Sequence, residues 1–283
     1  MNHYFENLIL LNIGYSELNG DWNWKDVYSP FARIYYVDKG SARTYIKDKT
    51  HILEPGYFYL TPPFTLHNDE CDSCFSLYYI HFYENMIREE SIFDKYDFPV
   101  KIKANRLDEL LVKRLHEINP GRHLEQIDPK IYDTQPNFSE FTAINKKIPF
   151  EVFTENQGLL SILMSRFLAH RENKSNDRDE RISKSLKYIH TKIYKDISIN
   201  DLADFSCVSE DHFIRLFKKE IGSTPVKYIN AKKIEKAQLL LLTSDLSIRS
   251  IAMELAMDNV SYFNKIFKQY TGKTPLEYRK TQR

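Results

Sequence analysis

The sequence predicts an α+β protein: an N-terminal β-barrel of jelly-roll type with flanking helices, followed by an all-α C-terminal domain with two helix-turn-helix motifs. Three observations lead to this prediction. The length of 283 residues fits two domains. Residues 31–82 alternate short apolar runs with turn signals, which is the rhythm of a β-meander or jelly roll. Residues 213–228 are echoed by residues 263–278, which indicates one helical unit built twice.

The two copies, FIRLFKKEIGSTPVKY and FNKIFKQYTGKTPLEY, align at a constant offset of fifty positions. The aligned pairs are Phe213 with Phe263, Arg215 with Lys265, Phe217 with Phe267, Lys218 with Lys268, Gly222 with Gly272, Thr224 with Thr274, Pro225 with Pro275 and Tyr228 with Tyr278. A unit built twice suits a partner that itself repeats, and double-helical DNA is such a partner.

The first copy contains the signals of a helix, a tight turn, a second helix and a stop. Ser198 is a good N-cap for a helix to about residue 205, and Ser209 can cap a second helix to about residue 220. Gly222 fits the stop of that helix. Pro225 then fits the first turn of another helix, where its missing N–H is harmless. This order of elements is the helix-turn-helix pattern.

The second copy predicts the same order. Ser247 caps its first helix, Ala256 and Met257 make the turn, Asp258 caps the second helix and Gly272 ends it. Between the copies, residues 226–242 predict one long connecting helix. The residues expected to join the core from this helix are Val226, Ile229, Ile234, Ala237 and Leu241.

Helical pairs also occur in bundles that never bind nucleic acid, but the charge distribution favours DNA. Residues 181–283 contain 19 Lys and Arg against 11 Asp and Glu, a balance of +8. The rest of the chain has a balance of −7, so the net charge of +1 conceals a basic C-terminal third. A basic patch of this kind is the electrostatic requirement for binding phosphates.

The C-terminal hundred residues resemble the DNA-binding domain of the AraC/XylS family. The matching positions are Leu202, Ala203, Ser209, Phe213, Arg215, Phe217, Lys218, Lys219, Gly222, Pro225 and Tyr228 in the first half, and Ile248, Ile251, Ala252, Ser261, Tyr262, Phe263, Phe267, Lys268, Gly272, Lys273, Thr274, Pro275, Tyr278 and Arg279 in the second. The sequence departs from the family at the second turn, where Ala256-Met257 replaces Gly-Phe. Ala256 would therefore need the turn to avoid a glycine-only conformation.

The resemblance implies seven helices that place two recognition helices in successive major grooves. The base-reading positions it implies are Glu210, Asp211, His212, Ile214, Arg215, Val260, Ser261, Tyr262, Asn264 and Lys265. By chemistry, Arg215 and less rigidly Lys265 suit guanine, Asn264 suits adenine, and Asp211 suits the cytosine amino group. The expected phosphate contacts are Ser198, Lys218, Lys219, Ser247 and Lys268, although lysines on a helix can equally form a solvated face.

The N-terminal half is similar to the cupin sensor domain of AraC-type regulators, through Gly40, Pro55-Gly56 and the segment from Pro62 to His67. This likeness implies a small-molecule effector in the barrel, and a homodimer formed through helices near residues 106–118 and 157–170. The many Tyr and Trp residues of this half suit a sugar-like or aromatic effector. The effector candidates are Trp22, Trp24, Arg33, Tyr35, Tyr36, Tyr59, His67 and Tyr79, although tyrosines are also ordinary strand formers. We expect residues 1–170 to form this domain, 171–180 a linker and 181–283 the DNA-binding domain.

Two alternatives remain open at this point. One is a regulator without an effector, which a barrel filled by its own tyrosines would favour. The other is a cupin enzyme with a DNA-binding tail, against which the dispersed His51, His67 and His81 argue, since catalytic cupins pair two histidines as His-x-His. A zinc site from Cys71, Cys74, His67 and His81 can be drawn, but its spacing is not that of a usual finger.

The expected class is therefore a sequence-specific transcription regulator without catalytic residues, cofactor or metal. Its expected partners are double-stranded DNA, a small-molecule effector and a second copy of the chain, with RNA polymerase as a further candidate and no membrane. Three cysteines and the lack of a signal peptide or bilayer-spanning stretch predict a cytoplasmic location.

Overall fold

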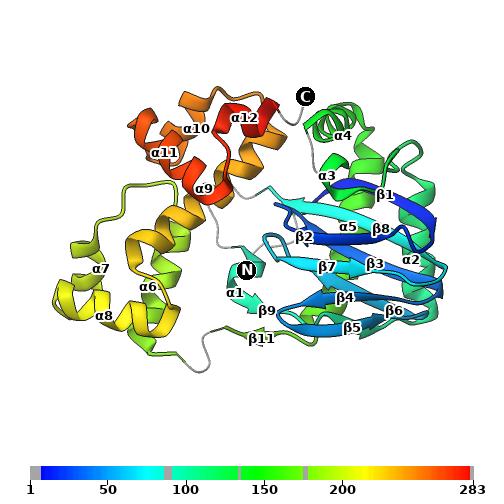
Figure 1. Ribbon diagram of the computed structural model, residues 1–283, viewed down its shortest axis with the longest axis horizontal. Coiled ribbons are helices and arrows are strands. Elements are labelled where there is room, and N and C mark those ends of the chain that lie inside the picture. The colour runs from blue at the N-terminus through cyan, green and yellow to red at the C-terminus, as the bar shows by residue number, and fades with distance from the viewer. Residues whose placement is uncertain (1–7, 86–90, 133–134, 175–177, 281–283) are drawn as a thin grey trace. The chain divides into compact units, whose positions relative to one another are not determined.

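The computed structural model describes residues 8–85, 91–132, 135–174 and 178–280 (Figure 1). The chain divides into two compact units. The first comprises Met1–Asn85 and Asp97–Glu172, and the second comprises Met86–Tyr96 and Asn173–Arg283. The second unit thus includes a short segment from the N-terminal half of the sequence, which no sequence pattern indicated.

The first unit is built on two antiparallel sheets, a five-stranded one in the order β1-β8-β3-β6-β10 and a four-stranded one in the order β2-β7-β4-β5 (Figure 1). The strands are β1 Leu8–Leu18, β2 Asn23–Val27, β3 Ala32–Gly40, β4 Ala42–Ile46, β5 Lys49–Leu53, β6 Tyr57–Thr61, β7 His67–Glu70, β8 Phe75–Glu84 and β10 Lys101–Lys103. This architecture confirms the predicted N-terminal β domain.

Strand alternation gives the five-stranded sheet an inner and an outer face. Tyr35 and Tyr79 point inward into a core cluster that also contains Trp22 of the segment before β2 and Leu53 of the other sheet. Tyr36 points the opposite way and contacts Phe58 with ring centroids 5.3 Å apart. Because side chains from both sheets form one cluster, the two sheets close around a shared interior.

The helices of the first unit are α2 Arg106–Glu117, α3 Pro129–Tyr132, α4 Gln135–Lys147 and α5 Phe150–Leu168. Helices α2, α4 and α5 pack against β1. Asn119 and Asn156 join the end of α2 to α5 by reciprocal amide hydrogen bonds of 2.6 and 3.1 Å. The expected helix at 106–118 is confirmed, whereas α5 begins seven residues before the expected 157.

The second unit is helical. Its helices are α1 Ile92–Lys95, α6 Glu180–Thr191, α7 Ile199–Phe205, α8 Glu210–Ile221, α9 Pro225–Thr243, α10 Ile248–Glu254, α11 Val260–Thr271 and α12 Pro275–Lys280. Strands β9 Tyr96–Asp97 and β11 Glu172–Asn173 form a two-stranded sheet where the chain passes between the units. Helix α9 is the connecting helix, and it is two residues longer than predicted.

Each helix-turn-helix has a hydrophobic core of its own. Phe213 and Phe217 pack with Ile229 in the first, and their counterparts Phe263 and Phe267 pack in the second. The repeat extends to ring geometry, because the two phenylalanine pairs have centroid separations of 5.7 and 5.8 Å. Helix α9 contributes to both cores, so it joins two separately packed modules.

Most of the residues expected to be buried on α9 are buried, namely Ile229, Ile234, Ala237 and Leu241. The expectation for Val226 is wrong, because this side chain is 49% exposed. It lies in the first turn, directly after Pro225, on the side of the helix away from the core. Among the described residues, no helix combines the length and apolarity required to cross a bilayer.

Candidate DNA interface and barrel cavity

Side-chain caps set where α7 and α8 of the first helix-turn-helix begin. Ser198 Oγ accepts a hydrogen bond from the backbone N–H of Asp201 at 3.0 Å, and Ser209 Oγ accepts one from His212 at 3.4 Å. Helix α8 stops at Gly222, which has a φ of +80° that favours glycine. The predicted caps and stop of the first helix-turn-helix are confirmed.

In the second helix-turn-helix, Ser247 Oγ caps α10 as predicted, but the cap of α11 differs from the prediction. The capping atom is Asn259 Oδ1, which accepts from the N–H of Tyr262 at 3.0 Å. The prediction of Asp258 is therefore wrong by one residue. The second turn is one residue longer than the first, because the α7 and α10 caps lie 49 positions apart and those of α8 and α11 lie 50 apart.

Both turns contain a non-glycine residue with a left-handed backbone. Cys207 has a φ of +54° in the first turn, and Ala256 has a φ of +47° in the second. The second turn therefore enters the left-handed region, and the φ of Ala256 lies close to values open to L-residues, so the expected avoidance of a glycine-only conformation holds. It uses the part of that region which L-residues can enter, at a cost of about 1–2 kcal/mol.

The recognition helices α8 and α11 present matching basic side chains to solvent. Arg215 and Lys265 are exposed at equivalent positions, as are Lys218 and Lys268. Among the other predicted DNA contacts, Ser198, Glu210, Asp211, His212, Lys219, Ser247, Ser261 and Tyr262 are exposed, and Ile214, Val260 and Asn264 are half-buried. The folding of both modules therefore brings the predicted set to the starts and outer faces of the expected helices.

The detailed contacts separate the strong base-reading candidates from the weaker ones. Arg215 Nε donates to the carbonyl of Asp211 at 3.2 Å, which uses one of its five donors. Asn264 Oδ1 is buried and has no hydrogen-bond partner among the described residues. Pairing with adenine would supply this oxygen with a donor, so base reading by Asn264 stays a prediction.

A buried lysine of α9 holds both modules. Lys233 is 4% exposed, and its Nζ donates to the carbonyls of Lys195 at 3.1 Å and Ala256 at 3.2 Å. The first carbonyl precedes α7, and the second lies in the turn between α10 and α11. Burial lowers the pKa of Lys233. Neither the repeat nor the resemblance indicated this contact.

The N-terminal barrel contains a small cavity between the inner face of its five-stranded sheet and the segment before α4. Its volume is about 20 Å³, which is room for about one water molecule. The lining residues are Ser16, Leu18, Trp22, Tyr35, Leu77, Tyr79, His81, Leu124, Ile127 and Tyr132. The predicted effector residues Trp22, Tyr35 and Tyr79 are thus brought together around one space.

Four polar side chains are buried in the same interior, with Arg33 and His81 on the five-stranded sheet and His67 and Asp69 on the four-stranded sheet. Arg33 Nη2 donates to Ser29 Oγ at 2.5 Å. His67 Nδ1 lies 2.9 Å from the Thr65 carbonyl. A carbonyl can only accept, so Nδ1 carries the proton and Nε2 is a bare acceptor.

Several atoms of this polar cluster have no hydrogen-bond partner within the described part of the chain. They are His67 Nε2, Asp69 Oδ1 and both ring nitrogens of His81. Burial lowers the pKa of His67 to about 3 and that of His81 well below its usual value. Burial also raises the pKa of Asp69 to about 6. Both histidines are therefore neutral at pH 7.

The other predicted effector residues lie elsewhere or are already engaged. Tyr36 is on the outer face of its sheet, so the structure does not place it in the interior. Tyr59 is buried, but its hydroxyl donates to the Ile52 carbonyl at 2.7 Å and accepts from the Glu54 N–H. Trp24 packs at the edge of the core cluster. Sequence reasoning missed His81 as a cavity residue and Asp69 as a buried polar one, although each lies two positions after a predicted residue on the same strand face.

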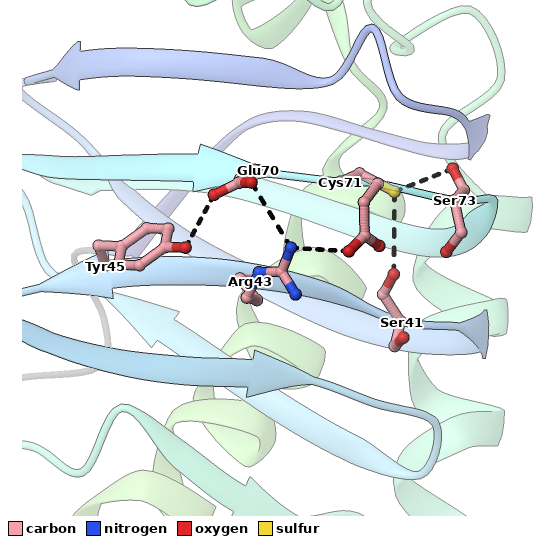
Figure 2. Close-up of polar contacts among 7 residues, drawn as sticks. Ser41, Arg43, Tyr45, Glu70, Cys71 and Ser73 are labelled. Carbon is pink, nitrogen blue, oxygen red and sulfur yellow. Dashed lines mark hydrogen bonds and ion pairs between the residues drawn. The ribbon is translucent and has the colours of Figure 1, made fainter.

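The cysteine pair does not form the zinc site that could be drawn from the sequence. Figure 2 shows the Cys71 thiol directed at the carbonyls of Ser73 and Ser41, at 3.1 and 3.8 Å. Beside it, Arg43 contacts Glu70 (Figure 2). The same guanidinium forms an ion pair of 2.7 Å with Asp72. Cys71 is buried and Cys74 is exposed. Among the described residues, no group of three or more His, Cys, Asp or Glu side chains is arranged to hold a metal ion.

Fold and site define a two-domain helix-turn-helix protein with an N-terminal β-barrel. Two family models are more specific: an AraC-like ligand binding domain matches residues 22–118, and a helix-turn-helix domain matches residues 202–281. The chain belongs to the AraC-type transcriptional regulators.

Several known proteins are similar to parts of this chain. An HTH-type transcriptional regulator of Staphylococcus aureus strain MSSA476 is 23% identical over 250 residues, which cover 87% of this chain and 31% of that protein. One of Haemophilus influenzae is 32% identical over 104 residues, 37% of this chain and 35% of that protein. This chain spans about a third of the length of these relatives. The C-terminal domain of AraT, a response regulator from Geobacillus stearothermophilus, is 29% identical, with a TM-score of 0.36 over 38% of this chain and 88% of that one.

Proposed function

We propose that this protein binds double-stranded DNA sequence-specifically through α8 and α11 and thereby regulates transcription. The observation that carries the proposal is the repetition of exposed basic positions, Arg215 with Lys265 and Lys218 with Lys268. Each recognition helix is fixed by its own core, and α9 holds the two modules in one unit. Successive major grooves on one face of DNA recur at about 34 Å, which suits a rigid pair of modules.

Within this proposal, base reading and phosphate binding fall to different residues. Arg215 and Lys265 read guanine, and Asp211 accepts from a cytosine amino group. Further base contacts come from Glu210, His212, Ile214, Val260, Ser261 and Tyr262, and phosphate contacts from Ser198, Lys218, Lys219, Ser247 and Lys268. Phosphate contacts set the position of the protein on the duplex, whereas base contacts determine which sequence it prefers.

We further propose that a small hydroxyl-bearing effector enters the barrel. The support is chemical, because His67 Nε2 and Asp69 Oδ1 are acceptors without partners among the described residues, and His81 offers one donor and one acceptor. Buried polar groups without partners are expensive, and ligand hydroxyls would satisfy them. The flanking rings of Trp22 and Tyr79 provide flat apolar faces for the carbon skeleton.

A second candidate is a regulator that takes no effector, and the size of the cavity favours it. A space of about 20 Å³ does not admit a sugar. An effector must therefore displace lining residues, and the ones that lie outside the strands of the two sheets are Trp22, Leu124, Ile127 and Tyr132. Burial of these side chains without movement would leave the barrel as a closed structural domain.

Homodimerisation through α2 and α5 belongs to the same proposal. Exposed apolar side chains lie on both helices, with Leu107 54%, Leu110 55% and Phe150 80% exposed. Exposed apolar side chains support a contact surface, although Leu107 and Leu110 lie at the opposite end of the packed helix pair from Phe150. The molar mass from light scattering decides the question, since a monomer over the working concentration range would contradict it.

One experiment tests these proposals together. Random DNA is selected against the full chain at moderate salt, the enriched site is footprinted, and the footprint is repeated with a panel of sugars and small aromatic compounds. We expect protection over about two helical turns per subunit. Quenching of tryptophan fluorescence reports occupancy, because Trp22 lines the cavity. No enriched site would refute DNA recognition, and an enriched site without any ligand response would support the regulator that takes no effector.

A further inference from the structure

A segment from the middle of the N-terminal half of the sequence forms part of the helical unit. Residues 91–96 include α1, which Ser91 caps by accepting from the N–H of Phe93 at 3.1 Å. Ile92 and Phe93 are 1% and 7% exposed, so this short helix is packed and not a surface loop. In the sequence it lies between β8 and β10 of the barrel. The helical unit is thus assembled from two separate parts of the chain.

A mostly buried ion pair joins α1 to α9. Asp94 Oδ1 lies 2.7 Å from Lys232 Nζ, and the two side chains are 17% and 20% exposed. Lys232 also contacts Glu235 of its own helix at 2.8 Å. Burial by itself would raise the pKa of Asp94, but the Lys232 ammonium outweighs it and holds this pKa below its usual range. Helix α1 also contacts the segment after β11, where Lys174 Nζ donates a hydrogen bond of 2.6 Å to the Phe93 carbonyl.

The next residue of α9 holds the two DNA-binding modules. Lys233 Nζ donates to Lys195 of the first module and to Ala256 in the turn of the second. Neighbouring residues on a helix point about 100° apart, so Lys232 and Lys233 contact different parts of the helical unit from adjacent positions on α9. Lys232 contacts α1, and Lys233 contacts the two helix-turn-helix modules. A shift of α9 at this point would change both contacts of Lys233.

We propose that docking of α1 on Lys232 sets the relative placement of α8 and α11, so that Asp94 and Lys232 are positioning residues for DNA recognition. The inference rests on the proposed contact of both recognition helices with DNA. It goes beyond that proposal because it assigns a role to residues that touch no DNA. The segment follows β8 in the sequence, and β8 carries the cavity residues Tyr79 and His81.

The predicted consequence is selective. Loss of the α1 contact should weaken binding that requires both modules at one spacing and should spare binding by one module. A residue important only for stability would affect both kinds of binding equally or neither. This difference allows a positioning role to be separated from a structural one.

The test uses the full chain with D94N, K232M and the double variant D94N/K232M. The matched control is E235Q, which removes the charge of the second carboxylate paired with Lys232 and leaves Asp94 unchanged. Affinity is measured on the selected site, on the same site with one half scrambled, and on sites with one base pair added between the halves. Thermal unfolding of every variant is recorded, and binding is measured well below the transition.

We expect D94N to lower affinity for the complete site at least tenfold and to leave the half-scrambled site within twofold of the wild type. K232M and the double variant should show the same loss as D94N, because the two residues act as one contact. E235Q should stay within twofold on both sites. Equal losses on complete and half-scrambled sites, or no loss on either, would overturn the positioning role.

A measurement without DNA separates this inference from the proposed function. Spin labels are placed at Asp204→Cys on α7 and Met253→Cys on α10, two exposed positions, with Cys74 and Cys207 replaced by serine. D94N should broaden or shift the distance distribution between the labels, and E235Q should not. An unchanged distribution in D94N would overturn the inference even if DNA recognition is confirmed. A changed distribution in a protein that selects no DNA would assign the failure to the proposed function instead.

Discussion

Lys233 Nζ donates a hydrogen bond of 3.2 Å to the carbonyl of Ala256, so a buried side chain of the connecting helix holds the backbone of the second helix-turn-helix turn. The same ammonium donates to Lys195 at 3.1 Å. Burying a charge is unfavourable unless it is hydrogen-bonded, and here two carbonyls at helix ends supply the partners. One residue thereby links both modules to α9.

Replacing this residue by methionine, K233M, should lower the free energy of unfolding by about 1–3 kcal/mol. The change keeps the volume of the stem but leaves the Lys195 and Ala256 carbonyls without their donor. Urea unfolding followed by circular dichroism measures the effect. The neighbouring exposed Lys227→Met is the control and should stay within about 0.5 kcal/mol of the wild type. Equal stability of the two variants would show that the ammonium contributes nothing.

Substituting glycine at the second turn, A256G, should stabilise the protein by about 1 kcal/mol. The φ of +47° is unfavourable for alanine and open to glycine. The free energy gained by removing this strain exceeds the entropic cost of ordering a more flexible glycine on folding. The matched variant is C207G, where φ is +54°. A rise of the thermal midpoint in both variants is the expected result. A lower midpoint in A256G would mean that the alanine methyl group contributes packing that outweighs the backbone strain.

R215A should weaken binding to the selected site by about 1–3 kcal/mol and relax preference at one base pair. Arg215 is exposed on α8 at the position expected to read guanine. The matched variant K218A, one turn along the same helix, should instead weaken binding to all sequences and reduce the salt dependence by about one ion. Competition binding against single-base variants of the site at several salt concentrations distinguishes them. A uniform loss in R215A would make this residue a phosphate contact.

Acid should destabilise the barrel through its neutral histidines, and H81F should reduce that effect. Burial lowers the pKa of His67 to about 3 and the pKa of His81 well below 6.5, so their contributions are present above about pH 6.5 and are lost as the pH falls. Asp69, with a pKa raised to about 6, acts oppositely, since its contribution is lost as the pH rises through 6. The two histidines together lose more stabilising free energy on acidification than Asp69 gains, so the free energy of unfolding should fall below pH 6.

Urea unfolding at pH 7 and pH 5 measures this dependence. H81F removes one titrating group and should reduce the loss by up to about 1.4 kcal/mol per pH unit. The exposed H212A is the control, because it removes a histidine of α8 in the helical unit and leaves the barrel interior unchanged. An identical pH dependence in H81F and the wild type would contradict the burial of an uncharged imidazole at this position.

The sequence was most informative where the signals are local. The caps Ser198, Ser209 and Ser247 and the stops Gly222 and Gly272 were predicted because a cap needs only its own first turn, and a left-handed stop needs only glycine. The one error of this kind, Asp258 for Asn259, arose because the two adjacent residues can both cap and the turn length was set by how α10 packs on α11. The alternation of strands should also have shown that adjacent Tyr35 and Tyr36 cannot both face the interior.

The sequence by itself determined the two-domain α+β class, the duplicated helix-turn-helix and the basic recognition helices, because periodicity, capping and charge are properties of contiguous residues. Only the tertiary structure decided that Asp94 pairs with Lys232, that Lys233 links the two modules, and that His67, Asp69 and His81 share one closed interior. These contacts join residues of different helices or strands, and they depend on how those helices and strands pack against one another. A single sequence contains no local signal for such meetings.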